Sequence, residues 1–152
     1  SITHVTFDPK SNSVMALANA FEVDHLTKGT VCRFDCATNE VSYAFTPGNH
    51  NLNLELLSLA YDDETGYLWI TVPQQNAVLV WDTNRRSFVT VIESWRFPQS
   101  VSLAANIDTV LIGSASGLKA HHRQNFRHMK KIDTKWESLS LNAFLAPHTR
   151  LI

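Results

Sequence analysis

A four-strand pattern recurs along the chain and limits its possible folds more than any other feature. Residues 77–92 read AVLVWDTNRRSFVTVI: an alternating apolar run, a polar turn and a second alternating run. This is the pattern of a β-hairpin. A similar stretch, RFDCATNEVSYAF, lies 47 positions earlier, and a third, GLKAHHRQNFRHMKKI, lies 40 positions later. Recurrence at this spacing indicates a repeat architecture.

The segments that precede these hairpins also resemble one another. Each holds an alternating strand, a turn and a strand of small and β-branched residues: ITHVTFDPKSNSVMALA, LLSLAYDDETGYLWITV and SVSLAANIDTVLIGSA. The turns DPKSN, DDETG and ANID contain the residue types that favour tight reversals. Each unit therefore has four short antiparallel strands, and a further unit opens near the last residues, SLSLNAFLAPHTRLI.

Four-stranded units at this period are typical of propeller blades. The sequence predicts an all-β chain, a partial β-propeller that forms one domain over residues 1–152. The expected blades cover residues 1–47, 54–93 and 98–133, and a fourth begins over 136–152. Residues 11–26 also admit a helix, since they contain helix formers and a Ser N-cap. Their apolar positions do not keep a helical spacing, so we expect a strand over 14–18 followed by a long loop.

The repeats resemble the WD40 family. Trp81-Asp82 lies where that family places its namesake pair, at the end of the third strand, and the other units carry Phe34-Asp35 and His121-His122 there. Gly48-Asn49-His50 is a distorted form of the family's Gly-His. Gln75-Asn76 replaces its turn aspartate, and Thr71 matches its second-strand hydroxyl. The resemblance implies a protein-interaction scaffold with at most part of the family's buried hydrogen-bond network.

Three blades are too few to close a ring, because propellers close with about four to eight. An open arc exposes an apolar face at each end, and monomers rarely expose large apolar patches. We expect the ring to be completed by other sequence, or failing that by a homo-oligomer. The chain begins SITHVTF without an initiator Met, so we expect a fragment, a processed product or an engineered segment.

The charge is divided unevenly between the two halves of the chain. Residues 1–75 hold nine acidic and three basic residues, and residues 76–152 hold five acidic and ten basic residues. The basic residues are densest in 119–131, where an anion-binding candidate consists of Lys119, Arg123, Arg127, Lys130 and Lys131. Such a patch can bind phosphates or an acidic partner. The alternative is a solvated outer strand that protects a sheet edge. No nucleic-acid module accompanies the patch, so we do not expect nucleic acid as the partner.

Two short motifs are candidates for binding. Trp95, Arg96 and Phe97 lie in a loop between blades, and loops of this kind carry binding residues. Because Trp and Arg are enriched in interaction hot spots, these three are the candidate contact with a protein partner. Asp62-Asp63-Glu64 could ligate calcium, but DDETG lacks the spacing of a calcium loop and we expect a hairpin turn.

The sequence contains no nucleophile, metalloprotease or phosphate-loop motif. We therefore expect a non-catalytic protein with no cofactor and no metal; the alternative is an enzyme whose channel site is completed by absent blades. Cys32 and Cys36, the only cysteines, are too far apart along a strand for a disulfide, and we expect two buried thiols. No run of about 20 apolar residues could span a bilayer. We expect a cytoplasmic or nuclear location.

Overall fold

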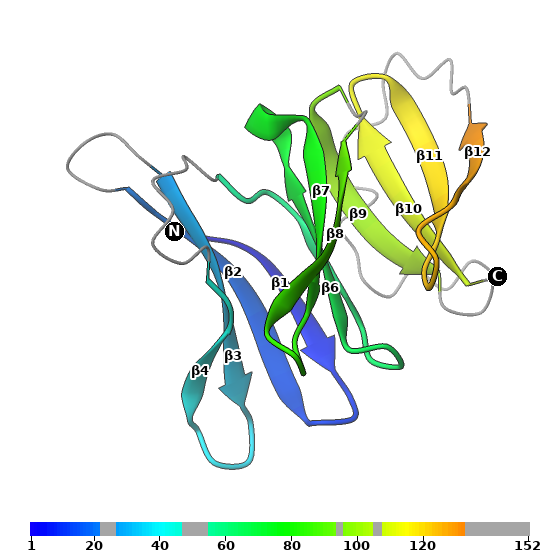
Figure 1. Cartoon of the computed structure of the whole chain (residues 1–152). Coiled ribbons are helices and arrows are strands. Elements are labelled where there is room, and N and C mark those ends of the chain that lie inside the picture. The colour runs from blue at the N-terminus through cyan, green and yellow to red at the C-terminus, as the bar shows by residue number, and fades with distance from the viewer. Residues whose placement is uncertain (22–26, 47–54, 94–95, 105–107, 133–152) are drawn as a thin grey trace, which may run out of the picture.

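The computed structural model describes residues 1–21, 27–46, 55–93, 96–104 and 108–132, which form three four-stranded antiparallel sheets (Figure 1). The first sheet contains β1 (Ile2–Asp8), β2 (Ser13–Phe21), β3 (Thr27–Asp35) and β4 (Val41–Phe45). The second contains β5 (Leu59–Asp62), β6 (Tyr67–Val72), β7 (Ala77–Asp82) and β8 (Ser87–Glu93). The third contains β9 (Pro98–Ala104), β10 (Thr109–Ser114), β11 (Gly117–His122) and β12 (His128–Ile132).

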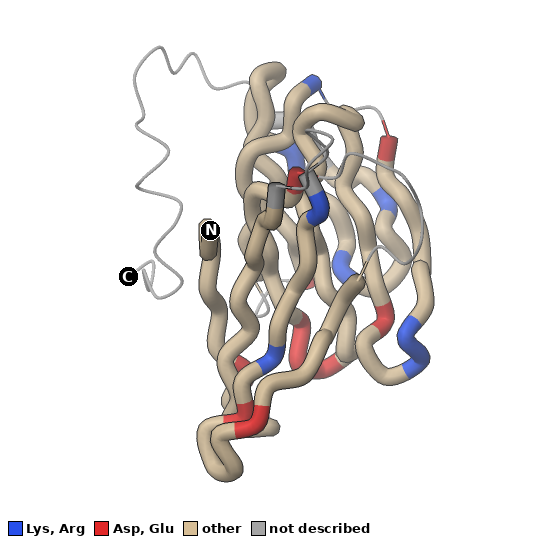
Figure 2. Tube along the Cα trace, turned by 90° about the vertical axis from the view of Figure 1, so that its left-hand side faces the viewer, with Lys and Arg blue, Asp and Glu red and all other residues tan. Residues whose placement is uncertain are grey.

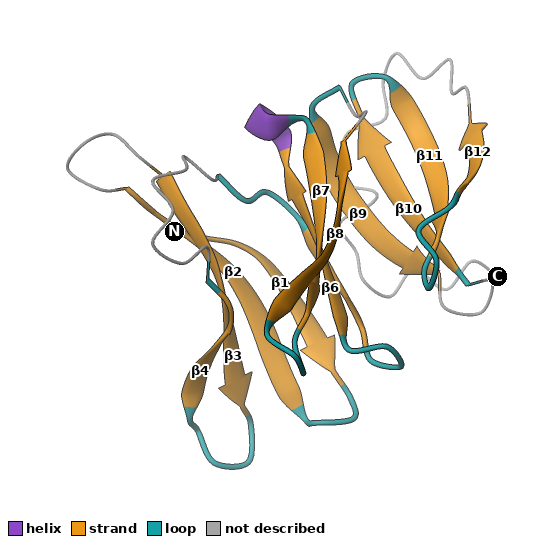
Figure 3. Ribbon diagram, in the orientation of Figure 1, coloured by secondary structure: helices purple, strands orange, loops and turns teal. Residues whose placement is uncertain are grey.

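Within each sheet every strand pairs with its neighbour in sequence. One helical element, the single 3-10 turn η1 (Pro73–Gln75), interrupts the strands of the described residues (Figure 3). The helix considered for residues 11–26 does not form over its described part. Instead β2 runs from Ser13 to Phe21 and pairs with β3 along its whole length, so the strand is longer than the sequence predicted.

An aspartate ends the first and third strands of the first two sheets. Each of these side chains accepts a backbone N–H from the turn that follows it, over distances of 2.8–3.1 Å: Asp8, Asp35, Asp62 and Asp82. Aspartate favours such turns because its carboxylate bonds the backbone two residues on. The hairpin turn expected at DDETG is confirmed, since the Gly66 amide also donates to the Asp62 carbonyl.

The turn at Asp35 corrects the prediction for the cysteines. Both thiols are free, but Cys36 is exposed and Cys32 is only half-buried. The strand ends at Asp35, whose carboxylate accepts the amides of Ala37 and Thr38. Cys36 therefore lies in the turn, and a strand pattern alone could not place the end of β3.

The sheets stand side by side and share two apolar cores (Figure 1). Between the first and second sheets, Met15, Leu17, Val31 and Phe45 pack against side chains such as Leu68 and Ile70. Between the second and third sheets, Trp69 and Val80 pack against Val110 and Ile112. The first strands β1, β5 and β9 contact one another in turn along one side of this stack.

The fourth unit expected over 136–152 lies outside the described residues. In the part of the chain that the structure describes, no helix is long and apolar enough to cross a membrane. Several acidic residues gather at one end of the sheets, where the hairpin turns lie (Figure 2). We call this the lower end: the turns 9–12, 36–40, 63–66, 83–86 and 123–127. The upper end consists of residues 73–76, 96–97 and 115–116.

Candidate functional site

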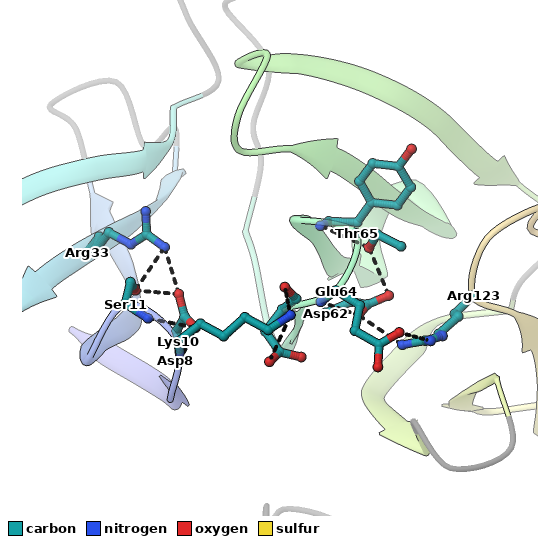
Figure 4. Close-up of polar contacts among 10 residues, drawn as sticks. Asp8, Lys10, Ser11, Arg33, Asp62, Glu64, Thr65 and Arg123 are labelled. Carbon is teal, nitrogen blue, oxygen red and sulfur yellow. Dashed lines mark hydrogen bonds and ion pairs between the residues drawn. The ribbon is translucent and has the colours of Figure 1, made fainter.

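Charged side chains join the three sheets at the lower end (Figure 4). Arg123, in the turn between β11 and β12, is 4% exposed. Its Nη1 lies 3.1 Å from Asp62 Oδ1 in the second sheet, and its Nε lies 2.7 Å from Asp108 Oδ1 in the third. Its Nη2 pairs with Glu64 of the second sheet. The hydrogen bond with Glu64 raises the pKa of Arg123, against the effect of burial.

A second set of charged contacts lies in and beside the first sheet. Arg33 Nη2 on β3 donates to Asp8 Oδ2 at 2.9 Å, and Asp8 is 1% exposed. Lys10 Nζ donates to the Asp63 carbonyl of the second sheet at 2.8 Å. These contacts use the carboxylates of the lower end as partners for bases within the chain. The lower end is therefore a set of structural bridges between neighbouring sheets.

This geometry separates Arg123 from the other anion-binding candidates. Arg123 is buried among three carboxylates, so its guanidinium is already occupied by groups of this chain. Arg127 is exposed in the same turn. Lys119 on β11 lies opposite Lys131 on β12, and Ala120 lies opposite Lys130. The outer corner of the third sheet thus carries the basic positions 119, 127, 130 and 131.

At the upper end, the structure places two of the three hot-spot candidates beside two turns. The Phe97 amide donates to Asn76 Oδ1 at 2.9 Å, and the Arg96 carbonyl accepts the Ala115 amide at 3.0 Å. Asn76 follows η1 in the second sheet, and Ala115 lies in the β10–β11 turn of the third. These bonds fix residues 96–97 between the two sheets. Trp95 lies outside the described residues.

The side chains of Arg96 and Phe97 point outward from this anchored backbone. Both residues are exposed, and Phe97 exposes 43% of its surface. Its φ of 52° lies in the left-handed region, which is uncommon for a bulky residue and indicates a backbone held by its surroundings. Gln74 lies two residues before Asn76, the partner of Phe97, and its Nε2 donates to Glu55 Oε2 at 2.7 Å. The upper end therefore presents an aromatic ring and a guanidinium on a hydrogen-bonded loop.

A histidine and a serine meet where the first strands adjoin. His4 Nδ1 lies 3.2 Å from Ser58 Oγ, and the same oxygen accepts the Val101 amide at 3.2 Å. This chain of bonds links β1, the segment before β5, and β9. Ser58 is 1% exposed, and burial lowers the pKa of His4. The pair has the atoms of a nucleophile and a base, but Ser58 is enclosed and its oxygen is engaged.

Two of the residues that resemble the WD40 pattern, Trp81 and Thr71, form hydrogen bonds with the backbone. Trp81 Nε1 donates to the Ala44 carbonyl of the first sheet at 2.9 Å. Thr71 Oγ1 accepts the Ser58 amide at 2.9 Å within the second sheet. Among the described residues, no group of three or more His, Cys, Asp or Glu side chains could hold a metal ion.

Comparison with known proteins gives a fold but no family. No family model and no curated protein matches the chain. Solved structures do match: hydrazine synthase of Kuenenia stuttgartiensis is 14% identical over 88% of this chain and 36% of its own, with a TM-score of 0.65. The structure of U3-55K is 12% identical over 87% and 39%, also at 0.65. Saccharomyces cerevisiae Sqt1 is 10% identical over 85% and 35%, at 0.62.

These neighbours include proteins of the WD40 or propeller type. The chain is accordingly all-β, a partial β-propeller built from four-stranded antiparallel blades, as the sequence predicted. It spans well under half the length of each structure compared above.

Proposed function

We propose that the chain is a non-catalytic scaffold that binds a protein partner through the upper end of its second and third sheets. The contact is the loop of Trp95, Arg96 and Phe97. Aromatic rings and arginines carry much of the binding energy in protein interfaces. The propeller-type neighbours support a role of this class.

The observation that carries this proposal is the fixed and exposed position of Phe97. A mobile loop loses conformational entropy when a partner orders it. Here the Phe97 amide is bonded to Asn76, and the preceding carbonyl is bonded to Ala115. Because the backbone is already held, the exposed ring can bind at a smaller entropic cost.

A non-catalytic role agrees with the surroundings of His4 and Ser58. The serine hydroxyl is enclosed among the first strands and accepts the Val101 amide. A nucleophile must instead reach its substrate with an adjacent base free to take its proton. This pair is better suited to joining the three sheets.

A photo-crosslinking amino acid at position 97 would identify the partner in cell extract, with position 91 as the control. Val91 is exposed to 44%, close to the 43% of Phe97, but lies on β8. The affinity of the captured protein is then measured for purified variants. We expect Phe97→Ala and Arg96→Ala each to weaken binding about tenfold or more, and Val91→Ala to leave it unchanged. Equal crosslinking at both positions, or unchanged affinity in the two loop variants, would refute the proposal.

The outer corner of the third sheet supports a second candidate function, the binding of an anionic partner. The specific observation is the register that sets Lys119 against Lys131, with Arg127 exposed in the adjoining turn. Retention on phosphocellulose should fall when Arg127, Lys130 and Lys131 are changed to Glu, and should weaken with salt. Retention that ignores both salt and these substitutions would count against this function.

A further inference from the structure

The first sheet turns an apolar face to solvent. Strand register places two rows of side chains on this face: Val5, Ala16, Cys32 and Tyr43 in one, and Phe7, Val14, Phe34 and Val41 in the other. The large members are exposed by 38–68%: Val5, Phe7, Phe34, Val41 and Tyr43. Exposed apolar surfaces of this kind mark interaction sites.

The corresponding face of the second sheet is buried against another sheet. Its corresponding rows are Leu59, Ile70 and Leu79, and Tyr61, Leu68 and Trp81. In the second sheet these rows belong to the core shared with the first sheet. Leu68 and Ile70 are fully buried there. Within the chain, therefore, the rows of the second sheet that correspond to the exposed rows of the first sheet are covered by a neighbouring sheet.

The third sheet has an opposite face without such a cover among the described residues. Register aligns Ser102, Leu111 and Ala120 in one row, and Ser100, Gly113 and Leu118 in the next. Leu111 and Leu118 are half-buried, and Ala120 is 7% exposed. The equivalent positions in the second sheet, Trp69 and Val78, are fully buried against the third sheet.

These two faces, which no described sheet covers, are complementary in the size of their side chains. The face of the first sheet carries aromatic rings, whereas the face of the third sheet carries mainly serine, glycine and alanine around two leucines. Bulky side chains opposite small ones allow two layers to interdigitate at native packing density.

Charge favours joining these two faces rather than two copies of either one. Residues 1–46, which contain the first sheet, carry five acidic and three basic residues, and residues 96–132, which contain the third sheet, carry one acidic and six basic residues. Pairing the first sheet with the third sheet brings an acidic segment of one chain to a basic segment of another. Pairing the first sheet with the first sheet would bring two acidic segments together, which costs energy.

We propose that two copies of this chain associate head to tail, with the first sheet of each packed on the third sheet of the other. This is a heterologous contact, because two different faces meet. Such contacts close into a ring when the rotation that relates one copy to the next brings the last copy back to the first. The described residues of two copies supply six four-stranded sheets, within the range of about four to eight blades in which propellers close. The proposal does not depend on the partner contact at the upper end.

Sedimentation equilibrium of the 152-residue chain tests the association. We expect a dimer at micromolar concentration, and a loss of affinity of about tenfold or more for Val41→Lys and for Leu118→Lys. Val91→Lys is the matched control. Val91 also lies on the outer strand of its sheet and is 44% exposed, but the second sheet already packs against the first and third sheets of its own chain. It should leave the dimer intact. Val41 is 68% exposed, so its substitution leaves the monomer folded, which circular dichroism verifies.

Mixing the two weakened variants tests the head-to-tail arrangement. Val41→Lys retains an intact third sheet, and Leu118→Lys retains an intact first sheet, so the mixture should form a heterodimer with one complete interface. A wild-type chain that stays monomeric at about 100 µM would overturn the proposal. A dimer unaffected by Leu118→Lys, or variants that do not associate with each other, would overturn it equally.

Discussion

Arg123 places its guanidinium between carboxylates of two sheets. Of its partners, Asp62 is fully buried, whereas the side chains of Glu64 and Asp108 are more than half exposed. Water and salt weaken the exposed pairs. The buried contact with Asp62 therefore dominates, because removing the arginine leaves a carboxylate without its countercharge inside the protein.

We expect Arg123→Ala to lower the free energy of unfolding by about 3–5 kcal/mol, the usual cost of breaking a buried ion pair from one side. Urea titration followed by tryptophan fluorescence measures this. The control is Arg85→Ala, because Arg85 pairs with Asp82 at 3.8 Å but its side chain is 83% exposed. That change should cost at most about 1 kcal/mol. Equal losses for both variants would show that Arg123 does not join the sheets.

His4 gives the fold a dependence on pH. Burial lowers its pKa from the usual 6.5, so the unfolded chain takes up the proton more readily than the folded chain. Its contribution to stability is complete above pH 6.5 and is lost as the pH falls toward the folded-state pKa. Burial also lowers the pKa of His121, which acts in the same direction.

We expect the free energy of unfolding to decrease between pH 7 and pH 5, by at most about 1.4 kcal/mol per pH unit for each histidine. His4→Asn should reduce this slope, since the amide oxygen can still accept the Ser58 hydroxyl but does not titrate. Urea titrations at several pH values give the slope. A slope that is identical in the variant would assign the pH dependence to other groups.

At the scale of the strand, Trp81 on β7 joins two sheets. Its Nε1 donates to the Ala44 carbonyl of β4, and its ring meets Phe45 edge-on at 5.2 Å and Phe88 at 5.0 Å. One side chain thus combines a hydrogen bond and an aromatic contact across the interface with a second aromatic contact inside its own sheet.

Substitutions at Trp81 separate these contributions. Trp81→Phe keeps an aromatic ring and removes the indole donor, so it should cost about 1–2 kcal/mol. Trp81→Ala also removes the ring and should cost about 3–5 kcal/mol. Thermal and urea unfolding of the two variants measure the difference. A phenylalanine variant as unstable as the alanine variant would mean that the hydrogen bond, rather than packing, provides the stability.

The strands were predictable because their evidence is local. Alternation of apolar residues and turn-forming aspartates define the hairpins at Asp62 and Asp82 without knowledge of distant residues. The role of Arg123 is not local: its partner Asp62 lies 61 positions away. In the sequence it is one member of a basic run, and only the packing of the third sheet on the second distinguishes it from Arg127.

At the upper end, too, the sequence could not predict contacts between distant residues. The sequence indicated Arg96 and Phe97 from residue type and their place between two repeats. It gave no sign that Asn76 and Ala115 would hold their backbone, since those bonds connect three separate turns. Residue type identified the candidates, and tertiary contacts supplied their rigidity.

At the scale of the whole molecule, each of the two apolar cores of the described residues joins one pair of neighbouring sheets. The core between the first and second sheets shares no residue with the core between the second and third. In such stacks, stability is close to a sum of sheet and interface contributions. Damage to one interface should therefore loosen the sheet at that end more than the sheet at the other.

Hydrogen exchange of the monomeric chain, below the concentration at which the proposed dimer forms, tests this coupling directly. Met15→Ala removes a fully buried side chain from the core of the first and second sheets, and Ile112→Ala does the same between the second and third. Each should cost about 2–5 kcal/mol, which corresponds to faster exchange by more than tenfold in the sheet that is loosened. Met15→Ala should accelerate amides of β1–β4 and spare β9–β12, and Ile112→Ala should do the reverse. The two experiments control each other, because a single cooperative unit would accelerate all three sheets equally in both variants, in conflict with neighbour-only coupling.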